Sequence, residues 1–256
     1  MSGLLAAAVL LAGCSGAPQM TGGPLPASKG PLSGTLTVFA ASSLTGVFGE
    51  LGDRLKAADP GLDIRFNFAG SSALATQITQ GAPADVFAAA SQKTMAPVTD
   101  AKLAQGTPVV FAQNVLEIAV PKGNPGHVTG LADFSKPALK LAICAPSVPC
   151  GAAAATVFAA AGIDAKPDSL EEDVKAALTK VSLGEVDAAL VYTTDVQAAG
   201  DKVQGIPFPE AEQAVNTYPI CVLSAAPDKP AAQAFVDLVR SAAGQAALKA
   251  AGFRTP

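Results

Sequence analysis

Apolar and polar residues along the chain follow two periods, one typical of strands and one typical of helices. Over 62–68 every second residue is apolar, which predicts a strand with one buried face. Over 44–55 the apolar residues recur every three or four positions, which predicts an amphipathic helix, and Pro60-Gly61 ends that pattern. The same alternation continues to the C-terminus. The segments that read as strands are 35–41, 62–68, 86–90, 115–120, 139–143, 186–192 and 219–224.

The segments between these strands have helical spacing, and Gly81 and Gly162 each follow one of them, as glycine often does at a helix end. Strands and helices in alternation predict parallel sheets covered by helices, so the expected fold class is α/β. Ligand sites in such folds lie beyond the carboxyl ends of the strands, where helices begin. The segments that read as helices are 44–55, 74–78, 152–161, 174–181 and, as a pair, 230–250.

Composition narrows the possible functions. The 256 residues are 50% apolar and 15% charged, which allows one large domain or two medium ones with ample core. The net charge is −4 and no basic cluster occurs, so we expect no nucleic-acid partner. A His-rich metal centre cannot form from His127 alone with scattered Cys. The absence of Trp and the presence of two Tyr argue against an aromatic platform for sugars.

The N-terminus has the features of a targeting segment. The apolar run 4–11 is too short to span a bilayer. It leads into Leu11-Ala12-Gly13-Cys14, which resembles the cleavage box of bacterial lipoproteins, so we expect a signal segment over 1–14 and a lipid on Cys14. The alternative is an ordinary secretory peptide cut near Ala17. No Lys or Arg precedes the run, and we expect the true start to lie further upstream.

Residues 15–34 are rich in Gly, Pro, Ser and Ala, which predicts a flexible tether. A coil of this length spans about 25 Å, enough to hold a domain off a membrane surface. We therefore expect a protein anchored to the cell membrane on its extracytoplasmic face.

Three cysteines remain after Cys14. An exported protein favours oxidised cysteines, and Cys144 and Cys150 bracket a short loop. A Cys144–Cys150 disulfide and a pair of free thiols are equally open at this point. Cys221 lies in an apolar, strand-like run and is expected to be an unreactive core thiol.

Five separated stretches place small hydrogen-bond donors where a strand ends or a helix begins. Helix N-termini suit an anion because their first N–H groups have no partner within the helix. Together with Gly81-Ala82-Pro83-Ala84-Asp85-Val86-Phe87, these stretches resemble the periplasmic molybdate-binding proteins of bacterial ABC importers, and the resemblance extends over 35–255. The five stretches are 40–45, 68–72, 149–151, 171–174 and 191–192.

The resemblance implies the two-lobed fold of type 2 periplasmic binding proteins, with mixed, mostly parallel sheets and a cleft between the lobes. The first lobe would comprise 35–113 and 217–256, and the second 114–216. Two segments would cross between the lobes near 113–114 and 216–217. The implied function is capture of molybdate and tungstate for the membrane permease subunits of an ABC importer. We expect a monomer that is not an enzyme.

The resemblance also implies five ligand contacts. Their donors are the hydroxyls of Ser43, Ser71 and Tyr192 and the backbone N–H groups of Cys150 and Val174. This set contains no Lys or Arg, no resident metal and no cofactor, because molybdenum enters only within the oxyanion. The family more commonly has Ala at the position of Cys150, so that donor departs from the pattern.

The same residues leave other interpretations open. Ser43 and Ser71 each follow a strand and precede a helix, so either could be an ordinary N-cap. The ligand could be another one bound by this fold, such as sulfate or ferric iron, although ferric sites use clustered phenolates and Tyr192 and Tyr218 are separated. A hydrolase would pair one of the serines with His127 as base, yet no Gly-x-Ser-x-Gly motif surrounds either serine. The last alternative is a purely structural surface lipoprotein.

Overall fold

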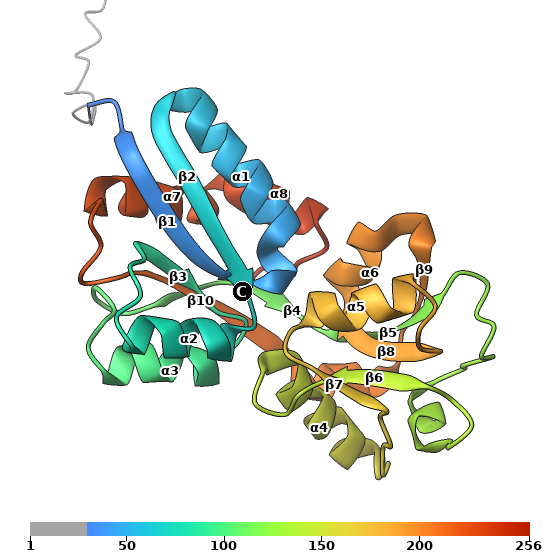
Figure 1. The fold of residues 1–256 in the computed structure, drawn as a ribbon. Helices are drawn as coiled ribbons and strands as arrows, with labels where there is room; N and C mark the ends of the chain where they lie inside the picture. The colour runs from blue at the N-terminus through green and yellow to red at the C-terminus, as the bar shows by residue number, and fades with distance from the viewer. Residues whose placement is uncertain (1–29) are drawn as a thin grey trace, which may run out of the picture. The chain divides into compact units, whose positions relative to one another are not determined.

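Two mixed β-sheets carry the fold in the computed structural model, which describes residues 30–256 (Figure 1). Residues 32–256 form one compact unit, and all of the strands lie within it. The expected signal segment 1–14, its Cys14 and most of the expected tether lie outside the described residues. Among the described residues, no helix is long and apolar enough to cross a membrane.

The first sheet has the strand order β2-β1-β3-β10-β4. Strand β1 is parallel to β2 and β3, whereas β10 is antiparallel to both of its neighbours, β3 and β4. The carboxyl ends of β1 and β2 therefore lie at the same edge of the sheet. The strands are β1 (Ser33–Ala41), β2 (Gly61–Ala69), β3 (Val86–Ala88), β4 (Val109–Asn114) and β10 (Asn216–Val222).

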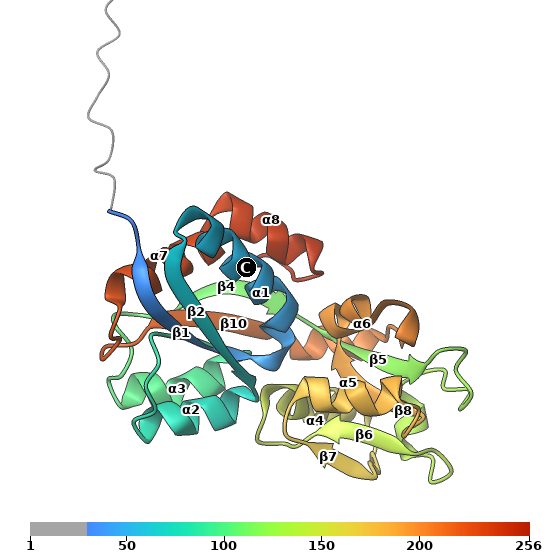
Figure 2. The same cartoon turned by 45° about the horizontal axis from the view of Figure 1, so that its top comes forward.

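Helices cover both faces of this sheet (Figures 1 and 2). One face and its helices α1, α7 and α8 share a core that contains Phe48, Phe111 and Phe235. The other face packs on α2 and α3 around Leu74 and Met95. The helices are α1 (Thr45–Ala58), α2 (Ser71–Thr79), α3 (Gln92–Asp100), α7 (Lys229–Arg240) and α8 (Ala242–Ala250).

The second sheet has the order β7-β6-β8-β5-β9, with β6 parallel to β7 and β8, and β5 antiparallel to β8 and β9. Helices α5 and α6 lie against β8 and β5, and α4 packs on β6. The elements are β5 (Leu116–Pro121), β6 (Leu141–Cys144), α4 (Pro149–Ala161), β7 (Ser169–Glu171), α5 (Val174–Ser182), β8 (Ala188–Tyr192), α6 (Thr193–Ala199) and β9 (Val203–Ile206).

Two neighbouring segments connect the sheets. Strand β4 ends at Asn114 and β5 begins at Leu116, so the chain passes from the first sheet to the second there. It returns at Asn216, where β10 begins, and Asn216 pairs in register with Asn114. We call the part built on the first sheet the first lobe and the part built on the second sheet the second lobe.

Several element boundaries differ from the sequence expectations, and those of β1 and α4 concern the expected tether and the loop of Cys150. Strand β1 begins at Ser33, inside the expected tether 15–34, because Ser33 and Gly34 extend the pairing with β2. Helix α4 begins at Pro149 instead of Ala152, since proline is well suited to a first helical turn.

Candidate functional site

The five residues singled out from the sequence line one pocket between the two lobes. The first lobe contributes Ser43 and Ser71, and the second contributes Cys150, Val174 and Tyr192. The pocket has a volume of about 10 Å³, on the scale of one water molecule. Its size suits a small ion better than a sugar or a peptide. Its other lining residues are Ala41, Ser42, Ala69, Gly70, Ala90, Val148, Pro149 and Asp173.

Neither serine is an ordinary helix cap, so that alternative is wrong. Ser43 lies in the 3₁₀ turn Ser42–Leu44, and its Oγ is 3.0 Å from the hydroxyl of Tyr218. Ser71 is the first residue of α2, and its Oγ accepts the backbone N–H of Ala90 at 3.0 Å. Because Ser71 Oγ already accepts a hydrogen bond, its own hydroxyl proton is left to donate to another group.

The second-lobe donors lie in the first turns of two helices. Cys150 follows Pro149 at the start of α4, and Val174 is the first residue of α5. Asp173 caps α5 by accepting the N–H groups of Lys175 and Ala176, which leaves the N–H of Val174 uncapped. Such first-turn N–H groups have no acceptor within the helix, and the helix dipole favours negative charge beside them.

A disulfide closes the loop that presents Cys150. Cys144 and Cys150 are bonded, with their Cα atoms 5.6 Å apart, which decides between the two alternatives left open by the sequence. Gly151 lies so close to the loop that a Cβ there would be 2.0 Å from the carbonyl oxygen of Ala145. The start of α4 is therefore held both covalently and by close packing.

Cys221, the remaining cysteine of the described part, lies in β10 and is a free, buried thiol. Its Sγ is 3.8 Å from the sulfur of Met95, and burial raises the pKa of the thiol to about 12. This agrees with the expected unreactive core cysteine.

The hydroxyl of Tyr192 is free to bind a ligand. The side chain is 1% exposed, and its hydroxyl has no hydrogen-bond partner within residues 30–256. Burial, followed by the neighbouring Tyr218 and Asp195, raises the pKa of Tyr192 well above its ordinary value. Burial also raises the pKa of Tyr218. Both phenols therefore stay protonated at neutral pH and keep a proton to donate, which disfavours a ferric site built on phenolates.

The cation closest in sequence to this donor set is already neutralised. Lys175, next to Val174, places its Nζ 2.8 Å from Oδ1 of the fully buried Asp195. The other carboxylate oxygen of Asp195 accepts the backbone N–H of Tyr192 at 3.1 Å. Burial raises the pKa of Asp195, and the charge of Lys175 opposes that shift. The ion pair thus ties the start of α5 to the end of β8, and no Lys or Arg lines the pocket.

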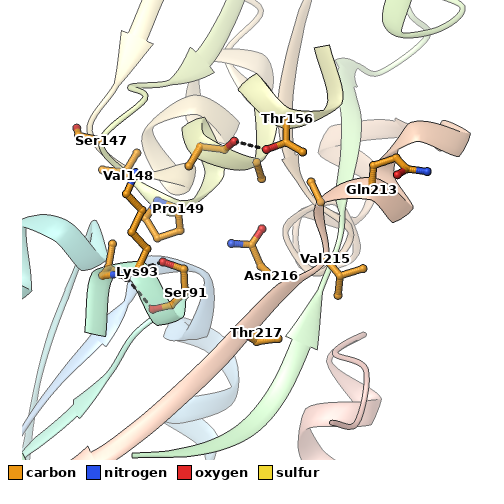
Figure 3. Close-up of a pocket in the computed structure, with 14 residues that line it drawn as sticks. Ser91, Lys93, Ser147, Val148, Pro149, Thr156, Gln213, Val215, Asn216 and Thr217 are labelled. Atoms are coloured by element: carbon orange, nitrogen blue, oxygen red, sulfur yellow. Dashed lines mark hydrogen bonds between the residues drawn. The ribbon is translucent and has the colours of Figure 1, made fainter. Parts of the chain in front are cut away.

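A second hollow, of about 240 Å³, shares Val148 and Pro149 with the small pocket (Figure 3). It is larger and contains a cation, Lys93, together with Ser91 and Asn216, but none of the five expected residues lines it. We assign the candidate site to the smaller pocket, because that pocket gathers buried donors that lack acceptors.

The hydrolase alternative finds no support in the geometry. His127 is exposed on a loop of the second lobe and does not line the pocket that holds Ser43 and Ser71. Among residues 30–256, no group of His, Cys, Asp and Glu side chains is placed to hold a metal ion.

Sequence reasoning missed the residues that support the donors. Tyr218 holds Ser43, Asp195 positions Tyr192, and the N–H of Ala90 orients Ser71. Tyr218 and Ala90 lie far from their partners in the sequence, and an Asp such as Asp195 is a common residue near a helix start. An Asp three residues after the strand run 186–192 was the available sequence signal.

The family is shown by comparison with known proteins. The family model described as bacterial extracellular solute-binding protein matches residues 36–254, and the chain belongs to this family. It is 43% identical over 235 residues to the molybdate-binding protein ModA of Mycobacterium tuberculosis, covering 91% of this chain and 90% of that protein. It is 32% identical to the molybdate-binding protein ModA of Escherichia coli, covering 86% of this chain and 89% of that protein.

Solved structures confirm the two-lobed α/β fold expected from the sequence. The substrate-binding domain of a molybdenum ABC transporter, described as putative, from Clostridium difficile matches with a TM-score of 0.64 at 28% identity, over 87% of this chain and 99% of that one. The periplasmic molybdate-binding protein of Azotobacter vinelandii matches with a TM-score of 0.74 at 21% identity, over 86% of this chain and 99% of that one. The sulfate-binding protein SubI of M. tuberculosis matches with a TM-score of 0.71 at 17% identity, over 86% of each chain.

The two phenols give the site a pH signature. Tyrosines of an unfolded chain ionise near pH 10. Because the folded-state pKa values of Tyr192 and Tyr218 are raised, the unfolded chain loses these protons first, and the free energy of unfolding should fall as the pH rises beyond about 10. Both phenols should ionise together with unfolding.

A pH titration that follows tyrosinate absorbance and circular dichroism on the same sample tests this, since the chain has two Tyr and no Trp. Tyrosinate at pH 10 in folded protein would contradict the assignment.

Proposed function

We propose that this protein captures molybdate and tungstate outside the cytoplasm and delivers them to the permease subunits of an ABC importer. The observation that carries the proposal is the convergence of neutral donors from both lobes on one buried pocket. Relatives named molybdate-binding proteins, at 43% and 32% identity, support the same ligand. We further propose that the protein acts as a monomer, without a cofactor and without catalysis.

The chemistry of the donors favours a dianion that carries no proton. Ser71 and Tyr192 offer hydroxyl protons, and Val174 and Cys150 offer helix-start N–H groups. The one carboxylate of the lining, that of Asp173, already accepts two N–H groups. A protonated anion would bring a donor that lacks an acceptor, at a cost of about 1–3 kcal/mol. Molybdate, tungstate and sulfate all meet this requirement.

The relatives favour the metal oxyanions over sulfate, the alternative ligand. A likeness to a sulfate-binding protein at 17% identity shares the fold alone, whereas the more similar relatives carry molybdate in their names. We therefore favour molybdate and tungstate over sulfate.

Calorimetric titration of residues 32–256 against an oxyanion panel tests the ligand. We expect one-to-one binding of molybdate and tungstate, with much weaker binding of sulfate and no measurable binding of phosphate, which carries a proton near neutral pH. Sulfate bound at least as tightly as molybdate would refute the proposed ligand. No heat with any of the four ions would refute the oxyanion-binding function altogether.

Replacing Ser71 by Ala removes one donor to the ligand. Hydrogen bonds to charged groups contribute about 1.5–3 kcal/mol, so molybdate should bind roughly 10- to 150-fold more weakly. Ser72→Ala is the matched control, because the neighbouring Ser72 does not line the pocket. Titration of both variants, with melting curves to confirm folding, measures the difference. Equal affinities in two folded variants would exclude Ser71 from the ligand contacts.

We also propose that the protein is held at the membrane by a lipid on Cys14, with 15–32 as the tether. The support is the run Leu11-Ala12-Gly13-Cys14 before a segment rich in Gly and Pro. Cys14→Ser should move the protein from the membrane fraction to the soluble fraction, whereas Ser15→Ala should leave it at the membrane. Fractionation of the host cells measures this, and a wild-type protein already found in the soluble fraction would contradict the anchor.

A further inference from the structure

Gly70 makes an unusually close contact between the two lobes. A Cβ built on Gly70 would lie 2.3 Å from the carbonyl oxygen of Glu172 and 3.2 Å from Cγ1 of Val148. Gly70 belongs to the first lobe, and the other two residues belong to the second. The backbone of Gly70 has φ −59° and ψ 131°, which any residue can adopt, so the need for glycine here is purely steric.

This contact lies at the wall of the candidate site. Gly70 directly precedes Ser71, and both line the pocket. Glu172 precedes Asp173, the cap of α5, and Val174, its first residue. The distance between Gly70 and Glu172 therefore sets the distance between a first-lobe donor and a second-lobe donor.

Neither side of the contact can turn away from an added methyl group. The group that a Cβ would meet first is a backbone carbonyl, which cannot rotate as a flexible side chain can. The segment behind it is fixed, because Asp173 caps α5 and the N–H of Ala145 is bonded to the carbonyl of Glu171. The lobes would have to move apart to relieve the overlap.

We propose that Gly70 is a positioning residue that sets how closely the lobes approach around the ligand. This inference rests on the proposed function. With glycine at 70, the hydroxyl of Ser71 and the N–H of Val174 reach one small ion together. A side chain at position 70 would keep the carbonyl of Glu172 further from the first lobe, so the two donors could no longer reach the same ion. The proposal includes that the lobes sit further apart when no ion is bound, so that an added side chain meets the overlap only on closure around the ion.

The test compares Gly70→Ala with the matched control Gly49→Ala, a helical position in α1 where a Cβ meets nothing within 4 Å. Calorimetry with molybdate, melting curves with and without molybdate, and solution scattering are recorded for both variants and the wild type. For Gly70→Ala we expect at least tenfold weaker binding, an unliganded melting temperature equal to that of the wild type, and a smaller ligand-induced fall in the radius of gyration. Gly49→Ala should bind like the wild type.

Val148→Leu provides a second variant, because it crowds the same contact from the opposite lobe and should also weaken binding. Wild-type affinity in folded Gly70→Ala would overturn the role of Gly70. A melting temperature lowered equally with and without molybdate would overturn it as well, since the residue would then serve only the fold. A wild-type protein that binds no oxyanion would instead refute the proposed function, so the two failures are distinguishable.

Discussion

The architecture depends on a requirement of hydrogen bonding: a buried donor without an acceptor costs about 1–3 kcal/mol. Between the lobes, the protein gathers donors, and several of them have no acceptor within residues 30–256. The hydroxyl of Tyr192 is buried and unpaired among the described residues, and the N–H of Val174 begins a helix whose cap serves its neighbours. An anion that accepts from all of them removes this cost in one step, and no positive side chain is needed.

Parallel strands explain why the donors meet. Strands β1 and β2 end side by side, and Ser43 and Ser71 follow those two ends. In the second lobe, β8 ends at Tyr192, and α5 begins beside it through the pair of Lys175 with Asp195. Asp195 also neutralises the charge of Lys175, so the site has no net positive charge although a cation lies next to it in sequence. The Cys144–Cys150 disulfide holds the remaining donor.

Periodicity predicted many of the elements, and the resemblance to molybdate-binding proteins supplied the five residues that share the pocket. Periodicity missed α3, where Pro97 and several polar residues hide the helical period, and short edge strands such as β7 and β9, which have few apolar positions. It also missed β4 and α6. It could not predict that Tyr218 holds Ser43, or that Gly70 lies against Glu172, because both contacts join segments distant in the chain. Periodicity indicates which face of a helix or strand is buried, but it does not indicate which residues pack against that face.

A crystal structure of the protein with molybdate tests the central claim most directly. The account predicts one ion in the small pocket between the lobes, in contact with Ser43, Ser71, Tyr192 and the N–H groups of Cys150 and Val174, and with no Lys or Arg in contact. An ion found instead in the larger hollow beside Lys93, or an ion held by a cation drawn into the cleft, would contradict it.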